Sequence, residues 1–145
     1  MTPTLPQLLV GQAASIAAPQ PPEAGPDYVA GRMGTIALLT MLAAQEAERG
    51  PAARAWENDA LREMFARAAA AHDGALNGAL GAAASLRGDM TWSGLDQVNA
   101  ELRRVLIRLH AHAETGGDLA LDREILRLYK DMAEARRLDL PSGPA

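Results

Sequence analysis

The sequence predicts an all-α protein, an up-and-down bundle of about five helices. Apolar residues make up 48% of the 145 residues, so a sizeable core is available, yet only 3% of the chain is aromatic. Alanine, the best helix former, supplies much of the apolar fraction, whereas the β-branched residues that favour strands are sparse. Apolar side chains also recur at helical spacing along the chain.

The first helix is predicted over residues 4–18, where Thr4 and Gln7 fit a capping box. The apolar residues on one face of this helix are Leu5, Leu8, Leu9, Ala13 and Ile16. We expect this face to pack on the bundle or on a second copy. The alternative, an arm that binds a partner or a membrane surface, lacks the basic residues typical of membrane binding. Residues 19–25 are rich in proline, which favours an extended linker that can let the first helix reach a neighbouring subunit.

The central helix is predicted over residues 26–49, and Gly50-Pro51 is predicted to end it. Its segment Met33–Ala44 carries no charge and is apolar almost all the way round, so we expect the other helices to pack against it. The segment spans twelve residues, fewer than the roughly 18–20 that a membrane-spanning helix needs.

Residues 51–87 are predicted to form one long helix, or two helices with a break between them. One apolar stripe of this region includes Trp56 and Met64, and a neighbouring stripe includes Leu61 and Phe65. The two stripes together indicate a broad buried face.

Two more helices are predicted over residues 94–114, with Ser93 as the N-cap, and over residues 121–138. For the whole chain, the predicted organisation is an N-terminal helix and linker (1–25), a helical bundle domain (26–140) and a frayed tail (141–145).

Composition narrows the class of protein. The net charge of −4 and the pI of about 5.3 argue against a nucleic-acid-binding protein. The chain has no cysteine, which excludes disulfides and thiolate metal sites. The first residues lack the basic and apolar regions of a secretory signal. We therefore expect a cytoplasmic protein that does not bind a membrane.

No catalytic motif is recognisable in the sequence, and no cofactor or metal site is predicted. His110 and His112 are two positions apart on a helix, so their side chains point in different directions and cannot chelate one ion. The candidates for ligand binding, at or beyond the ends of the apolar segment, are Tyr28, Arg32, Glu46 and His72. The candidates for anion binding are Arg103, Arg104 and Arg108, with an ordinary solvated helix face as the alternative.

Several landmarks resemble a small bacterial family of unknown function. The landmarks are a leucine-rich start, Tyr28-Val-Ala-Gly-Arg-Met-Gly-Thr-Ile-Ala-Leu-Leu, Gln45-Glu-Ala-Glu-Arg-Gly-Pro51, Leu95-Asp-Gln-Val-Asn-Ala-Glu-Leu-Arg103 and the region 118–133. Members of that family are encoded beside, or fused to, aminoglycoside-phosphotransferase-like and acyl-CoA-dehydrogenase-like proteins. The resemblance implies a helical accessory protein in acyl-CoA or small-molecule catabolism, with one of those enzymes as its partner, and implies no catalytic residue.

The sequence therefore favours a non-catalytic accessory or interaction protein that forms a homodimer. The alternative is a ligand-binding or enzymatic helical bundle with a polar pocket at the ends of the central helix.

Overall fold

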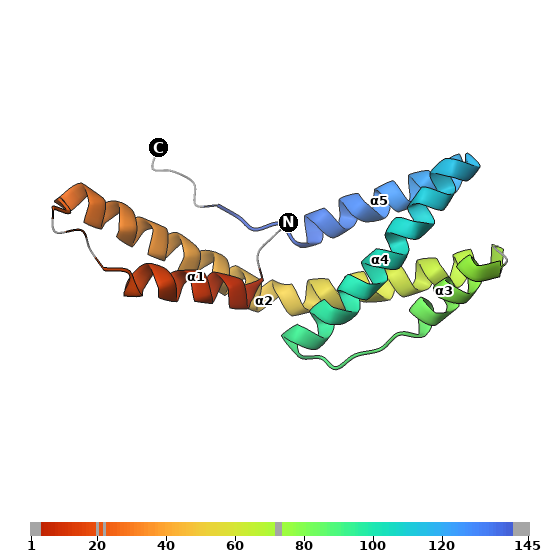
Figure 1. The fold of residues 1–145 in the computed structure, drawn as a ribbon, viewed down its shortest axis with the longest axis horizontal. Coiled ribbons are helices and arrows are strands. Elements are labelled where there is room, and N and C mark those ends of the chain that lie inside the picture. The colour runs from red at the N-terminus through yellow and green to blue at the C-terminus, as the bar shows by residue number, and fades with distance from the viewer. Residues whose placement is uncertain (1–3, 20, 22, 72–73, 141–145) are drawn as a thin grey trace. The chain divides into compact units, whose positions relative to one another are not determined.

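The computed structural model describes residues 4–19, 21, 23–71 and 74–140. These residues form five α-helices and no strand, which confirms the predicted all-α class (Figure 1). The helices are α1 (Leu5–Ala17), α2 (Pro26–Ala71), α3 (Gly74–Ser85), α4 (Trp92–Gly116) and α5 (Leu119–Ala135). Within this described part of the chain, none of the helices combines the length and the apolar character needed to cross a membrane.

The chain divides into two compact units. The N-terminal unit comprises Met1–Gly50 with Arg136–Ala145, and the core unit comprises Pro51–Ala135. The sequence placed a boundary after residue 25, whereas the structure groups α1 with the first part of α2 in one unit.

Helix α2 is much longer than predicted, because it continues through Gly50-Pro51 to Ala71. The prediction that this dipeptide ends the helix is wrong. A proline removes one main-chain hydrogen bond, but the cost can be offset where the turns beyond it are packed. Here those turns carry Ala53, Arg54 and Glu57, which are all buried.

The hydrophobic core lies in the core unit, where four helices contribute to it. Its members are Leu61, Met64, Phe65 and Ala68 of α2, Leu80 and Ala83 of α3, Val98, Leu102, Leu106, Leu109 and Ala113 of α4, and Ile125, Leu128 and Met132 of α5. The predicted stripe through Leu61 and Phe65 is confirmed, since both side chains are fully buried. Trp56 departs from its predicted stripe and is 43% exposed.

Helix α4 is held at both ends by local hydrogen bonds. Its N-cap is Thr91, two residues before the predicted Ser93, and the Thr91 hydroxyl accepts from the Gly94 N–H over 3.1 Å. Its C-cap is Gly117, whose positive φ of 68° suits a residue without a side chain. Asp118 then starts α5, because its carboxylate accepts from the N–H groups of Ala120 and Leu121 at 3.1 and 3.0 Å.

In the N-terminal unit, α1 lies alongside the first part of α2 (Figure 1). Gln12 of α1 donates to the Thr40 hydroxyl over 2.6 Å. The Gln7 side chain accepts from the Thr4 N–H over 2.9 Å, in line with the predicted capping box. The segment after α5 joins the same unit, since Gln45 donates to the Asp139 carbonyl and Arg49 contacts the Asp139 carboxylate.

The segment Met33–Ala44 does not form the buried centre of the fold. Of its twelve residues only Ala43 is buried, and Met33 is 57% exposed. Within the N-terminal unit α1 does contact this segment, since Gln12 donates to Thr40, but apart from Ala43 its residues are half-buried or exposed. The core instead uses the later turns of α2, where Leu61, Met64 and Phe65 contribute large apolar side chains.

Candidate functional site

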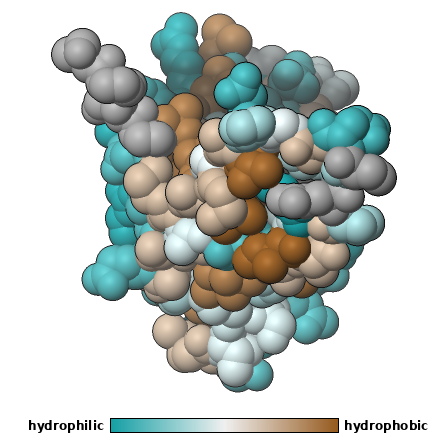
Figure 2. All heavy atoms as spheres, turned by 90° about the vertical axis from the view of Figure 1, so that its left-hand side faces the viewer, coloured by the Kyte–Doolittle hydropathy of each residue, from teal (hydrophilic) through white to brown (hydrophobic). Residues whose placement is uncertain are grey.

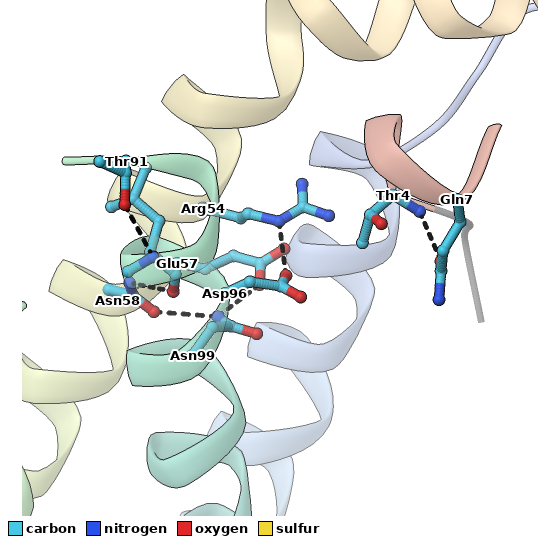
Figure 3. Close-up of polar contacts among 10 residues, drawn as sticks. Thr4, Gln7, Arg54, Glu57, Asn58, Thr91, Asp96 and Asn99 are labelled. Carbon is cyan, nitrogen blue, oxygen red and sulfur yellow. Dashed lines mark hydrogen bonds and ion pairs between the residues drawn. The ribbon is translucent and has the colours of Figure 1, made fainter. Parts of the chain in front are cut away.

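The core unit contains a buried polar network that joins α2 to the start of α4 (Figure 3). Asn99 of α4 donates to the Glu57 carboxylate over 2.9 Å and to the Asn58 side-chain oxygen over 3.0 Å. Asn58 in turn donates to the Leu95 carbonyl over 3.1 Å. The three polar side chains are almost completely inaccessible to solvent. Buried polar groups of this kind are costly unless they are paired, so the network fixes the register of the two helices.

Arg54 extends this network toward the first turn of α4. Its Nε donates to the Asp96 carboxylate over 2.8 Å, and its guanidinium lies 4.3 Å from the centre of the Trp92 ring. Arg54 is 1% exposed, whereas the Asp96 carboxylate reaches the surface. Arginine suits this position because its planar guanidinium can stack on an aromatic ring while it donates hydrogen bonds at its edge.

The carboxylate at the centre of the network is enclosed. Glu57 is fully buried, and its contacts with Asn99 occupy the side on which α4 lies. A carboxylate enclosed in this way can hold two helices together but cannot reach a solute. We therefore assign Arg54, Glu57, Asn58 and Asn99 to the architecture of the core unit.

The structure places the four ligand-binding candidates as follows. Tyr28 and Arg32 lie one turn apart on α2 and line the same open hollow of about 470 Å³. Glu46 is buried on the same helix, and its fourteen-residue separation from Arg32 corresponds to roughly 21 Å along the axis. His72 lies outside the described residues. The structure therefore brings Tyr28 and Arg32 together but separates Glu46 from them.

The contacts of Arg32 are made with α1. Its guanidinium donates to the carbonyls of Ser15, Ile16 and Ala18, all within 2.8 Å. The last carbonyls of a helix have no partner within the helix, so Arg32 satisfies the C-terminal end of α1. The hollow beside Arg32 and Tyr28 is consequently a place where two helices meet, with much of the cationic group already engaged.

The three anion-binding candidates lie exposed on α4. Arg104 forms an ion pair with Glu101 one turn earlier, and this hydrogen-bonded carboxylate raises the pKa of the Arg104 guanidinium. Arg103 lies close enough to Tyr129 for its charge to oppose the rise in the Tyr129 pKa that burial causes. Arg108 is exposed on the same helix. Among the residues that the structure describes, no hydrogen bond or ion pair joins the three arginines into one site, so anion binding stays a prediction.

The N-terminal unit exposes a group of large apolar side chains. Its members, each at least 36% exposed, are Leu9, Val10 and Ile16 of α1 and Tyr28, Val29 and Met33 of α2. Four apolar residues from the two helices, Ile16, Val29, Met33 and Ile36, line one open hollow of about 460 Å³. Figure 2 faces the side where α1 and α2 are joined and shows apolar residues at the surface there. We call this group the N-terminal apolar surface.

Comparison with protein-family models, with curated proteins and with solved structures finds no match to this sequence. The resemblance to a small bacterial family of unknown function therefore rests on the sequence landmarks alone. Function has to be argued from the residues and their arrangement.

One cluster was not anticipated from the sequence. His110, Glu114 and Asp122 bring one ligand atom each to within 4.8 Å of one another, in the turn region between α4 and α5. From the sequence we considered only whether His110 and His112 can bind one ion together. That comparison does not identify this cluster, because the partners of His110 are the carboxylates of Glu114 and Asp122. The available signal was the four-residue spacing of His110 and Glu114, followed by a Gly-Gly turn and an aspartate.

Proposed function

We propose that the protein is a non-catalytic interaction protein that forms a homodimer through its N-terminal apolar surface. The observation that carries this proposal is the exposure of large apolar side chains on α1 and the first part of α2, with Val10, Ile16 and Met33 each more than half exposed. Contiguous apolar surface of this kind typically marks a protein–protein interface.

The lack of charge on this hairpin favours a second copy of the chain as the occupant. Between Thr4 and Ala44 the only charged residues are Glu23, Asp27 and Arg32, and Arg32 is engaged with the end of α1. In a two-fold dimer each surface meets its own copy, so like charges meet unless the surface is nearly neutral. An almost uncharged apolar face meets this condition.

The hairpin has little core of its own. Among its described residues, the buried apolar side chains are Leu8 and Ala43. Two antiparallel helices bury only a narrow seam, whereas two such hairpins face to face form a four-helix arrangement with a shared core. Pairing would thus supply the burial that a single hairpin lacks.

The whole hairpin, of which the N-terminal apolar surface is one part, has about the size that a dimer interface needs. Two helices about 10 Å wide, one about 20 Å and the other about 37 Å long, present on the order of 600 Å² in projection. A side-chain surface is larger than its projection, and a standard interface buries roughly 800 Å² on each partner.

The resemblance described above extends the proposal to a second partner. A dimer formed in this way would be an accessory to an acyl-CoA-dehydrogenase-like or phosphotransferase-like enzyme. This part of the proposal rests on the sequence landmarks, and capture from the source cell with the purified dimer as bait tests it.

Light scattering coupled to size-exclusion chromatography tests the dimer. We expect the wild-type chain to elute with close to twice the 15.3 kDa mass of one chain. The double variant Ile16→Glu, Met33→Glu places two carboxylates on exposed positions of the N-terminal apolar surface and should give a monomer with unchanged helicity.

The matched control is Ile107→Glu, which introduces the same charge at a 62% exposed position on α4. It should leave the dimer intact. A wild-type monomer at tens of micromolar, or loss of the dimer in the Ile107→Glu control as well, would overturn the proposed interface.

A further inference from the structure

Three side chains that can ligate a metal converge where α4 meets α5. His110 and Glu114 lie one turn apart on α4, and Asp122 lies in the first turn of α5. The His110 Nε2 is 2.9 Å from the Asp122 Oδ1 and 3.9 Å from the Glu114 Oε1. The arrangement combines one imidazole nitrogen with two carboxylate oxygens from two different helices.

The backbone around this cluster is held in place on both sides. The turn from Gly116 to Asp118 is closed by hydrogen bonds from the N–H groups of Gly117 and Asp118 to carbonyls at the end of α4. Next to the cluster, Leu109 and Ile125 are fully buried in the core. The position of Asp122 opposite His110 is therefore set by packing and by the turn.

The imidazole itself is held by its surroundings. The ring of Tyr129 packs against the ring of His110 with 5.6 Å between centres and an interplanar angle of 54°. The side chains of His110 and Asp122 are 20% and 25% exposed, whereas Glu114 is 65% exposed and has room to move. Two of the three donors are thus positioned in advance, and the third can adjust.

We infer that His110, Glu114 and Asp122 form a binding site for a Zn²⁺ ion. Imidazole together with carboxylate is a donor set that suits zinc, whereas Mg²⁺ and Ca²⁺ prefer oxygen donors alone. The ligand atoms of a tetrahedral zinc site stand roughly 3.3 Å apart, given bond lengths near 2.0–2.1 Å. The 2.9 and 3.9 Å separations around the His110 Nε2 lie on either side of that value, so the Glu114 side chain must move closer and the His110–Asp122 contact must open by a few tenths of an ångström.

The ion would replace the direct hydrogen bond between His110 and Asp122. On binding, the imidazole nitrogen gives up its proton if it carries one, both carboxylates stay ionised, and a water molecule completes four-coordination. The ion then links α4 to α5 across their turn. This site shares no residue with the N-terminal apolar surface, so it can be tested independently of the proposed dimer.

Isothermal titration calorimetry with Zn²⁺ at neutral pH tests the site. The protein used is the whole chain, without a histidine tag and stripped of metal. We expect one ion per chain and a higher midpoint of thermal unfolding in the presence of Zn²⁺, because the ion binds only the folded arrangement. His110→Ala should abolish binding. Glu114→Gln removes the charge of an exposed ligand without disturbing packing and should weaken binding by about tenfold or more.

The matched control is His112→Ala, which removes a histidine two positions along the same helix whose side chain is exposed. It should bind Zn²⁺ as the wild-type chain does. Three results would each contradict the site. They are no Zn²⁺ binding by the wild type, wild-type affinity for Zn²⁺ in Glu114→Gln, and a loss of Zn²⁺ binding in His112→Ala equal to that in His110→Ala. If His110→Ala unfolds, Glu114→Gln still decides the question.

Discussion

The side-chain amide of Asn99 on α4 donates to the carboxylate of Glu57 on α2 over 2.9 Å, and both groups are buried. The same amide also donates to the Asn58 oxygen over 3.0 Å. A single asparagine thus serves two acceptors on neighbouring positions of the partner helix. Asn99 thus contributes, beside the contacts of Asn58 and Arg54, to the alignment of α2 and α4.

Replacement of Asn99 by alanine is expected to destabilise the core unit by about 2–3 kcal/mol, because a buried carboxylate loses a hydrogen-bond donor. Urea denaturation followed by circular dichroism measures the free energy of unfolding. Gln97→Ala, an exposed substitution on the same helix, serves as the control and should change it by less than about 0.5 kcal/mol. Equal effects of the two substitutions would remove the structural role assigned to the network.

The polar network explains a limit of the sequence-based reasoning. Arg54, Glu57 and Asn58 occupy the same helical stripe as Leu61 and Phe65, at spacings of three and four residues. Apolar periodicity identified the second half of the stripe but not the first, because charged residues on a helix usually face solvent. The burial of Arg54 depends on Trp92 and Asp96, which lie about forty positions away, and pattern alone cannot supply that pairing.

The opposite error concerns Met33–Ala44. Its uniform apolar character indicates a helix, which the structure confirms, and also predicts burial within one chain, which the structure does not show. Hydrophobicity gives the tendency to leave water and does not say which surface covers the segment. The capping box at Thr4, which the local sequence predicts, and the exposed Met33 illustrate the difference. Helices and their class follow from local sequence, whereas the location of the core depends on contacts distant in the chain.

Gly94→Ala is expected to destabilise the start of α4. A Cβ at this position would stand 1.9 Å from the Asp89 Oδ1 and 2.9 Å from the Asp89 carbonyl oxygen. The carboxylate can rotate away, but the carbonyl can move only with the loop, so we expect a loss of about 1–3 kcal/mol. Thermal unfolding measures it. Serine at position 94 should be no better tolerated than alanine, because it carries the same Cβ.

Gly81→Ala is expected to have the opposite effect on stability. Gly81 lies inside α3, and a Cβ there would meet no atom within 4 Å. Alanine reduces the conformational freedom of the unfolded chain and favours the helix, so the free energy of unfolding should rise by about 0.5–1 kcal/mol. The same holds for Gly78, and urea denaturation of both variants checks it. A loss of stability in both would mean that α3 packs more closely than its open glycines indicate.

The loop before α4 gives a prediction about pH. Hydrogen bonds from the hydroxyl and the N–H of Thr91 lower the pKa of the Asp89 carboxyl below its ordinary value of 3.8. Because the folded pKa is depressed, the stability that Asp89 contributes is present above the ordinary pKa and is lost as pH falls through the folded value. Thr91→Val removes the hydroxyl, so the Asp89 pKa should rise, as carboxyl NMR titration measures.

The same Thr91→Val substitution removes the N-cap of α4, with an expected loss of about 0.5–2 kcal/mol at neutral pH. Thr91→Ser keeps the hydroxyl and serves as the control, with the Asp89 pKa and the cap retained. If Thr91→Val left the Asp89 pKa unchanged, the hydroxyl would not be the main cause of its depression.

Arg32→Ala is expected to release α1 from α2. The guanidinium donates to three carbonyls at the C-terminal end of α1. Alanine has no side-chain donor that could replace these hydrogen bonds. Hydrogen exchange should therefore accelerate in residues 5–17, while the amides of Leu102 and Leu106 in the core unit keep their protection. The dimer should weaken in parallel, since Ile16 and Met33 would no longer share one face. Unchanged exchange in α1 would contradict the proposal that Arg32 holds α1 against α2.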